Sequence, residues 1–263
     1  MIHKFSLNFK NALITGASSG IGKSTAELFF KLGANILITG RNLENLNDTI
    51  KLCELSKVNE NQRIVAFTAD LTNEEDVKKL AEKTLLEFPK LDILINNAGV
   101  ISNDTIENVE MENFDSVMNM NLRSVIQLTN LLSPSLIDRK GSIVNVSSVA
   151  GTRAFPNVMS YCISKAALEQ FTKCTALDLA SKGVRVNAVS PGVTVTNLHK
   201  RAGMSESAYQ AFLEKSKTTH ALGRAGESEE IAYSIAFLAS DAASFTTGAI
   251  FPVDGGRHLM CPR

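Results

Sequence analysis

Short apolar runs, rich in Val, Ile and Leu, alternate along the chain with longer segments in which apolar residues recur every three to four positions. The short runs are typical of buried β-strands, and the longer segments are typical of amphipathic helices. We expect strands near residues 11, 35, 63, 91, 142, 185 and 248, with helices between them. Because strands that alternate with helices form βαβ units, the pattern predicts an α/β fold with a doubly wound sheet of about seven parallel strands and helices on both faces.

Length and composition predict a single domain over residues 1–263. Of the 263 residues, 44% are hydrophobic, which is enough to bury one substantial core. No stretch rich in Pro, Gly or Ser separates the predicted elements as a linker would. Two predicted helices, residues 114–132 and 158–180, are apolar on almost every side, which predicts that they contact another subunit.

A glycine-rich turn follows the first predicted strand, Asn11–Thr15. It reads Gly16-Ala17-Ser18-Ser19-Gly20-Ile21-Gly22 and leads into an apolar-periodic helix that continues to Leu32. The glycines allow a tight turn and a close approach of the backbone, while free N–H groups at the helix start attract a pyrophosphate. The unit predicts a Rossmann-type dinucleotide-binding fold, although its spacing, Gly-x-x-x-Gly-x-Gly, differs from the commoner Gly-x-Gly-x-x-Gly.

A P-loop is a second interpretation of the same residues, because Gly22-Lys23-Ser24 matches the last three positions of that motif. A strict P-loop has a glycine where Ala17 stands. A nucleoside triphosphatase would also leave Tyr161 and Lys165 without a chemical role. Magnesium-dependent ATP hydrolysis is therefore the weaker alternative.

Tyr161 and Lys165 stand four residues apart in a predicted helix, so their side chains share one face. A lysine charge at about 5 Å favours the tyrosinate and lowers the tyrosine pKa from its usual value of about 10. Such a tyrosine can act as a general acid or base. Ser148 ends the β-rich run Ser142–Ser148, where a hydroxyl can hold a carbonyl oxygen. The three side chains predict a hydride-transfer site around one oxygen.

Five separated motifs occur in order along the chain. They are Thr15-Gly16-x-x-x-Gly20-x-Gly22, Asn96-Asn97-Ala98-Gly99, Asn121, Ser148 with Tyr161-x-x-x-Lys165, and Pro191-Gly192. Together they resemble the short-chain dehydrogenase/reductase family, in its subgroup of single-domain carbonyl reductases and 3-oxoacyl reductases, over nearly the whole chain. The resemblance implies an enzyme that interconverts a carbonyl and a secondary alcohol of a small molecule by hydride transfer.

The resemblance implies a catalytic tetrad of Asn121, Ser148, Tyr161 and Lys165. Tyr161 would donate a proton to the carbonyl during reduction and accept one during oxidation, while Ser148 orients the oxygen. Lys165 would also bind the nicotinamide ribose, and Asn121 would help to hold a water that connects the lysine to solvent. Without the other motifs, Asn121 would be interpreted as a solvated asparagine in the predicted helix 114–132.

The second predicted strand ends in Thr39-Gly40-Arg41, where NAD-binding sites usually have an acidic residue. Gly40 stands in that place, and the arginine that follows can accommodate the 2′-phosphate of NADP. We therefore expect NADP(H) to be preferred, with NAD(H) possible. Against this, Arg41 could be a solvated loop residue, and many NADP-preferring relatives have a basic residue where this chain has Ser19, with Lys23 as a weaker substitute.

The resemblance assigns further cofactor contacts to residues at the carboxyl ends of the strands. The full predicted set is Gly16, Ser18, Ser19, Gly20, Ile21, Gly22, Arg41, Asp70, Leu71, Asn97, Ala98, Gly99, Tyr161, Lys165, Pro191, Gly192, Val193 and Thr196. An aspartate that caps the next helix is the alternative interpretation of Asp70. An ordinary small-residue turn is the alternative for residues 97–99.

Residues 193–222 are expected to form a substrate lid. The predicted helix 205–217 is amphipathic, which is consistent with a cover over an apolar carbonyl compound and equally with a helix packed on the body. Arg153, Lys200 and Arg201 are either attractors of an anionic substrate, such as an acyl thioester, or solvated surface charges. The sequence does not choose among the substrate classes of the family.

Composition and charge limit the kinds of partner that this chain is expected to bind. Lys plus Arg and Asp plus Glu number 27 each, so no strong field favours nucleic acid or an anionic membrane surface. No segment approaches the roughly 20 apolar residues of a membrane span, and we expect a cytoplasmic protein. The four cysteines and four histidines are scattered, which predicts reduced thiols and no metal site.

The leading hypothesis is an NADP(H)-dependent carbonyl reductase or alcohol dehydrogenase, and the resemblance implies that it is a homotetramer. A non-catalytic dinucleotide-binding scaffold or sensor is the alternative from a different class. The tetrad argues against the scaffold, because a scaffold has no chemical need for a tyrosine beside a lysine.

Overall fold

All seven predicted strands form, and they align in parallel in one sheet. The computed structural model describes residues 2–261, with strands β1 (Asn11–Thr15), β2 (Asn35–Gly40), β3 (Ile64–Thr68), β4 (Ile93–Asn96), β5 (Ser142–Val146), β6 (Arg185–Pro191) and β7 (Ile250–Val253). Their order across the sheet is β3-β2-β1-β4-β5-β6-β7. The strand order therefore reverses between β1 and β4, which is where doubly wound sheets bind ligands.

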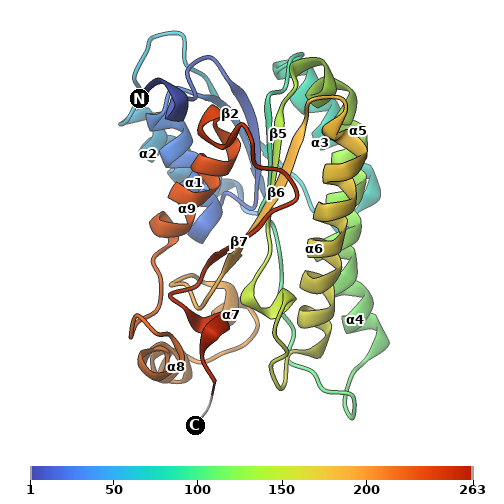
Figure 1. Cartoon of the computed structure of the whole chain (residues 1–263), viewed down its shortest axis with the longest axis vertical. Helices are drawn as coiled ribbons and strands as arrows, with labels where there is room; N and C mark the ends of the chain where they lie inside the picture. Colours follow the sequence, from blue (N-terminus) through green and yellow to red (C-terminus); the bar gives the residue numbers. More distant parts are fainter. Residues whose placement is uncertain (1, 262–263) are drawn as a thin grey trace.

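Helices cover both faces of the sheet (Figure 1). On one face lie α1 (Gly20–Lys31), α2 (Leu43–Glu54) and α9 (Ser228–Ala239), and on the other lie α3 (Glu74–Glu87), α4 (Met111–Met118), α5 (Ser124–Arg139) and α6 (Met159–Ala180). Below the sheet in Figure 1, α7 (Leu198–Arg201) and α8 (Glu206–Thr219) follow β6, and the C-terminal segment lies beside them. Shorter turns are η1 (Ile2–Phe5), η2 (Asn119–Arg123), η3 (Val149–Gly151), η4 (Asp241–Ala243) and η5 (Arg257–Leu259).

Alternation along the strands explains the two helical layers. Leu13 and Leu94 are buried in a core shared with α3 and α5, whereas Ile14 and Ile95, one residue further on, are buried in a core shared with α1 and α9. Both faces of each central strand are thus covered, as the near-continuous apolar runs of parallel strands require. The α/β fold predicted from the sequence is confirmed.

The helix expected over residues 114–132 begins earlier, ends later and is interrupted. The structure has α4 and α5 joined by η2, a π-helical turn over Asn119–Arg123. Such turns widen a helix locally and are frequent at functional sites, and Asn121 lies within this one. The other two helices agree closely with expectation, because Val158 is the N-cap of α6 and Ser205 is the N-cap of α8.

Candidate active site

A cleft of about 420 Å³ opens at the carboxyl ends of the strands. Its walls come from the glycine loop after β1, the turns after β2 to β6, the start of α6, both short helices after β6, and the C-terminal segment. This volume lies in the range of small-molecule and cofactor sites. The cleft lies across the point where the strand order reverses.

The glycine loop is fixed to the turn after β4 by hydrogen bonds. Thr15 Oγ1 accepts hydrogen bonds from the backbone N–H of Asn97 at 2.9 Å and of Ala98 at 3.0 Å, and Asn97 Nδ2 donates to Thr15 O at 2.8 Å. A Cβ on Gly16 would lie only 2.8 Å from Asn97 Nδ2, and Gly16 has a φ of +67°. A glycine is therefore required here for both space and backbone conformation.

The loop leads directly into α1, whose first turn has no side-chain cap. Ser19 occupies the N-cap position without a capping hydrogen bond. The N–H groups of the first turn of a helix need partners, and the helix dipole favours an anion there. An uncapped helix start behind a loop that requires glycine at Gly16 fits the pyrophosphate of a dinucleotide.

Tyr161 and Lys165 lie in the first turns of α6 and line the cleft together with Ser148. Ser148 Oγ accepts a hydrogen bond from Ala150 N at 3.1 Å, which leaves the serine hydroxyl hydrogen free to donate. Lys165 Nζ donates to the carbonyl oxygen of Val146 at 2.8 Å and lies 5.7 Å from the centre of the Tyr161 ring. The sheet and the helix thus bring the three predicted side chains to one wall.

Burial, rather than the lysine charge, dominates the protonation of this pair. Burial raises the pKa of Tyr161 to about 12, although the nearby Ser148 hydroxyl acts in the opposite direction. Burial also lowers the pKa of Lys165 to about 8, against the attraction of Glu169. The sequence predicts that Lys165 lowers the tyrosine pKa, but the pKa shift is in the opposite direction because a low-dielectric site disfavours both charges.

Asn121 lies beneath the cleft and uses its whole amide to fix neighbouring elements. Its Oδ1 accepts from Val100 N at 2.8 Å, while Nδ2 donates to Val100 O and to Ser164 Oγ, each at 2.9 Å. A Cβ on Gly99 would lie 3.2 Å from Asn121 Oδ1 and 3.6 Å from Lys165 Nζ. The asparagine is thus next to the lysine and is buried, unlike the solvated residue of the alternative interpretation.

Comparison with known proteins agrees with this geometry. A family model described as enoyl-(acyl carrier protein) reductase matches residues 16–258. The 3-oxoacyl-(acyl-carrier-protein) reductase of Thermotoga maritima is 37% identical over 251 residues, which cover 95% of this chain and 98% of the relative. The chain belongs to the short-chain dehydrogenase/reductase family.

Further relatives place this short-chain dehydrogenase/reductase among carbonyl–alcohol enzymes. The L-xylulose reductase of Caenorhabditis elegans is 35% identical over 249 residues, 94% of this chain and 95% of the relative. A solved short-chain dehydrogenase/reductase of Caenorhabditis elegans with cofactor has 40% identity and a TM-score of 0.90, covering 98% of this chain and 97% of that chain. The protein is an NAD(P)-dependent oxidoreductase that acts on CH–OH and C=O groups of small molecules. The predicted enzyme class is thus confirmed over the scaffold and nucleoside triphosphatase alternatives.

Most predicted cofactor residues of this dehydrogenase/reductase line the cleft, and two, Gly22 and Asp70, do not. Gly22 is packed beneath the loop against Gly16 and Asn97, and the carboxylate of Asp70 is bound by Thr72. Asp70 Oδ1 accepts from the backbone N–H of Thr72 at 3.0 Å and from its hydroxyl at 2.8 Å, forming a turn before α3. The neighbouring Leu71 lines the cleft. Asp70 is not the cap of the next helix, because the N-cap of α3 is Asn73. Its contact with the cofactor stays a prediction.

The three cations considered as attractors of an anionic substrate have other contacts. Arg153 Nη1 donates to backbone carbonyl oxygens of the C-terminal segment. Lys200 pairs with Glu206 at 2.7 Å, and Arg201 Nη2 donates to Ser19 Oγ at 2.8 Å. Two basic residues that the sequence analysis did not single out line the cleft, Lys215 of α8 and Arg257 of η5. No local sequence signal marks either one, because the chain returns to the cleft only through tertiary folding.

Residues 2–261, which the structure describes, also bear on membrane spans and metal sites. No described helix combines the length and the apolar character of a membrane-spanning segment. Within the same residues, no three His, Cys, Asp or Glu side chains are grouped as metal ligands would be.

Proposed function

We propose that this protein is an NADP(H)-dependent carbonyl reductase in which Tyr161 transfers the proton. The observation that carries the proposal is the common wall formed by Ser148, Tyr161 and Lys165 beside an uncapped, glycine-lined helix start. A carbonyl oxygen placed between the serine and tyrosine hydroxyls would lie within reach of both a hydrogen-bond donor and an acid. The segment 193–222, which supplies α7 and α8 to the cleft, would cover this substrate.

The cofactor end of the cleft supports a preference for NADP(H), with NAD(H) as a possible weaker cofactor. A Cβ on Gly40 would lie 3.1 Å from Ser18 Oγ, so an acidic side chain at this position would need a local shift. Arg41 follows and lines the cleft. Arg201 reaches over from α7 to Ser19 Oγ and so brings a second cation to the glycine loop, where the sequence has none. Two guanidinium groups at this end suit a phosphate ester.

When bound, the nicotinamide supplies the hydride that reduces the carbonyl carbon. Tyr161 donates its hydroxyl proton to the carbonyl oxygen, and Ser148 holds that oxygen by a hydrogen bond. Lys165 is anchored through Val146 O, so its remaining N–H groups are free to bind the ribose of the cofactor. Asn121 is a positioning residue, since it ties the turn after β4 to α6 beneath the lysine.

Burial raises the pKa of Tyr161 to about 12, so the protein itself favours the protonated tyrosine, which is the form that reduction uses. At neutral pH the tyrosine carries its proton and is ready to donate it. Oxidation of an alcohol would require the tyrosinate, and the cation of an oxidised nicotinamide would have to favour that form.

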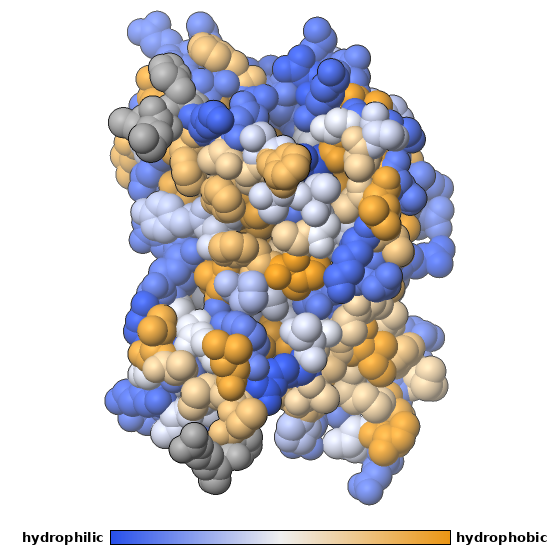
Figure 2. Space-filling view, in the orientation of Figure 1, coloured by the Kyte–Doolittle hydropathy of each residue, from blue (hydrophilic) through white to orange (hydrophobic). Residues whose placement is uncertain are grey.

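The proposal includes a homotetramer built through two apolar surfaces. On α5 and α6, the side chains of Ile126, Ile163 and Leu177 are exposed. At the edge of the sheet, the rings of Phe237 and Phe251 are tilted against each other with centroids 6.3 Å apart. Figure 2 shows hydrophobic side chains gathered over β7 and α9. Open strand edges and apolar helix faces are typical subunit contacts. Light scattering should give the mass of four chains, and a monomer alone would contradict this part of the proposal.

The test follows NADPH and NADH absorbance over a panel of ketones, aldehydes and 3-oxoacyl thioesters. Wild type is compared with Tyr161→Phe. The control variant is Tyr233→Phe, which changes an exposed tyrosine on α9. Loss of a general acid should lower kcat by about 10²- to 10⁴-fold in Tyr161→Phe, with NADPH binding kept. Tyr233→Phe should match wild type. Equal turnover by all three proteins would refute the role of Tyr161, and equal kcat/KM with both cofactors would refute the NADP preference.

A further inference from the structure

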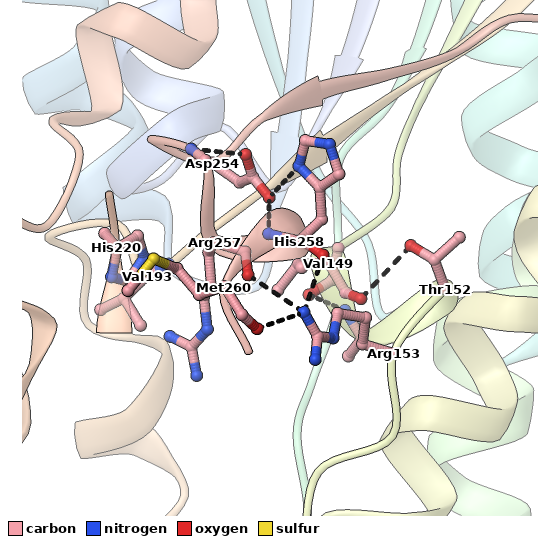
Figure 3. A network of polar contacts seen from close by, with 12 residues as sticks. Val149, Thr152, Arg153, Val193, His220, Asp254, Arg257, His258 and Met260 are labelled. Carbon is pink, nitrogen blue, oxygen red and sulfur yellow. Dashed lines mark hydrogen bonds and ion pairs between the residues drawn. The ribbon is translucent and has the colours of Figure 1, made fainter. Parts of the chain in front are cut away.

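Arg257 presents a guanidinium to the cleft without a partner among residues 2–261. It follows Gly256 in the C-terminal segment, and its Cζ lies 4.7 Å from the centre of the Phe155 ring. Its Nε is buried and has no hydrogen-bond partner among the described residues. In Figure 3 the guanidinium of Arg257 points away from the hydrogen bonds of Asp254 and Arg153. A buried donor without a partner is rare in proteins and calls for a ligand or another explanation.

Other residues hold the C-terminal segment, so the Arg257 side chain is not needed for that purpose. Asp254 Oδ2 accepts from the backbone N–H and from the ring Nδ1 of His258, each at 2.8 Å. Arg153 Nη1 donates to His258 O at 2.7 Å and to Met260 O at 2.8 Å (Figure 3). The turn that carries Arg257 is therefore fixed from both sides while its guanidinium remains free.

Asp254 attracts the Arg257 charge, but its carboxylate accepts hydrogen bonds from Gly256 and His258 and does not line the cleft. No Asp or Glu lies among the described residues that line the cleft, whereas Lys215 lies on α8 in the same wall. Burial and the Arg257 charge both lower the pKa of His199 and of His220. His199, whose neutral form is favoured, and Lys215 line the same cleft as the guanidinium. An anion entering the cleft would meet no carboxylate in its lining.

We propose that Arg257 binds the acid group of the substrate, so that this reductase acts on carbonyl compounds that carry a carboxylate or a phosphate. The inference rests on the proposed carbonyl reduction and adds the substrate class. A guanidinium whose face is stacked on an aromatic ring keeps its edge free, and this edge matches the two oxygens of an acid group. Phe155 and Phe212 line the same part of the cleft and suit an apolar spacer between the acid and the carbonyl.

The test uses substrates in matched pairs. Oxo acids of increasing chain length are compared with their methyl esters, and dihydroxyacetone phosphate with dihydroxyacetone, by kcat/KM with NADPH. Wild type should prefer one acid over its neutral analogue by at least about tenfold, and Arg257→Met should lose about 10- to 100-fold on that acid through KM, with the neutral analogue little changed. Whether the preferred acid is a carboxylate or a phosphate identifies the source of the charge.

Two control variants separate recognition from structure. Lys217→Met removes an exposed cation of α8 that pairs with Glu214, and it should leave both kcat/KM values unchanged. Arg153→Met loosens the C-terminal segment and should lower acid and ester together. If Arg257→Met also lowers both equally, its role is structural and the proposal fails, as it does if wild type shows no preference for acids.

A binding measurement keeps the inference testable without turnover. The enzyme–NADPH complex is titrated with butanoate and hexanoate, and with the corresponding amides, and NADPH fluorescence is followed. The acid site is supported if wild type binds the acid at least tenfold more tightly than the amide and Arg257→Met loses this difference. This holds even if no carbonyl is reduced, and then only the proposed function fails. Turnover of neutral carbonyls with equal binding of acids and amides would overturn the acid site alone.

Discussion

Replacing Lys165 by methionine should stabilise the fold while it removes activity. The side chain is buried, with 4% of its surface exposed, and burial lowers its pKa from 10.5 to about 8. At about 1.4 kcal/mol for each pKa unit, holding the charged amine in the folded protein at pH 7 disfavours folding by about 3 kcal/mol. Methionine removes that term but leaves Val146 O without its donor, which costs about 1–2 kcal/mol. We expect Lys165→Met to be more stable at pH 7 by about 1–2 kcal/mol.

The stability difference should also depend on pH with a defined sign. The folded pKa of Lys165 lies below the unfolded value, so between pH 8 and 10.5 the unfolded chain binds more protons and wild type gains stability as pH rises. From pH 7 to pH 9.5 this gain amounts to about 2 kcal/mol, and the methionine variant lacks it. Cys53, whose pKa burial raises to about 12, acts in the opposite sense above about pH 9, but it is present in both proteins. The advantage of the variant should therefore shrink to about zero.

Urea denaturation without cofactor, at pH 7.0, 8.5 and 9.5 and at one protein concentration, measures this difference. A fixed concentration matters because subunit association also contributes to apparent stability. The reasoning would be refuted by a variant that is less stable than wild type at pH 7. A difference that stays constant from pH 7 to 9.5 would contradict the assigned protonation change.

Three further outcomes follow from the site. Gly22→Ala would drive a Cβ into Asn97 Nδ2 and Gly16 O. It should weaken NADPH binding at least about tenfold in a fluorescence titration. The control Gly226→Ala, whose added Cβ has no neighbour closer than 3.8 Å, should bind NADPH as wild type does. Arg201→Met should raise the Kd for NADPH about tenfold and leave that for NADH nearly unchanged; equal losses would contradict a phosphate contact. His220 accepts from Val193 N at 3.1 Å and burial lowers its pKa below 6.5, so protonation on acidification should reduce wild-type stability below about pH 6.5. Urea midpoints at pH 5.5 and 7.0 should differ less in His220→Gln than in wild type.

The sequence predicted the frame of the site because that frame depends on local geometry. Buried parallel strands appear as continuous apolar runs, and the carboxyl ends of parallel strands meet at one edge. A helical spacing of four brought Tyr161 and Lys165 to one wall, and steric crowding at Gly16 matches the turn expected there. These features need only backbone geometry and short sequence distances.

The directions and protonation states of the side chains in the site could be determined only from the folded structure. Lys165 Nζ is directed to the carbonyl oxygen of Val146, nineteen residues upstream, and no spacing rule predicts that choice. Burial then decides the pKa of Tyr161, because desolvation depends on everything packed around the ring. Asp70 illustrates the same limit, since its carboxylate has partners in Thr72 that compete with any ligand.

The charge of the cleft was the property hardest to predict from the sequence. Composition gives only the balance of the whole chain, whereas the fold decides which charged residues line the cleft. The chain has 27 basic and 27 acidic residues, yet the charged residues lining the cleft are all basic, namely Arg41, Lys165, Arg201, Lys215 and Arg257. Arg41, Lys165 and Arg201 were singled out one by one from the sequence. Lys215 of α8 and Arg257 of η5 were not singled out, because only the fold brings them to the same cleft. Screening limits exposed charges to about 8 Å in physiological salt, so a balanced surface gives little attraction for a polyanion from afar. Inside a narrow cleft the same charges act at short range and with less screening. A field of this kind selects small anions that can enter. It would therefore link the two proposals physically, the phosphates of the cofactor at one end and an acid group on the substrate at the other.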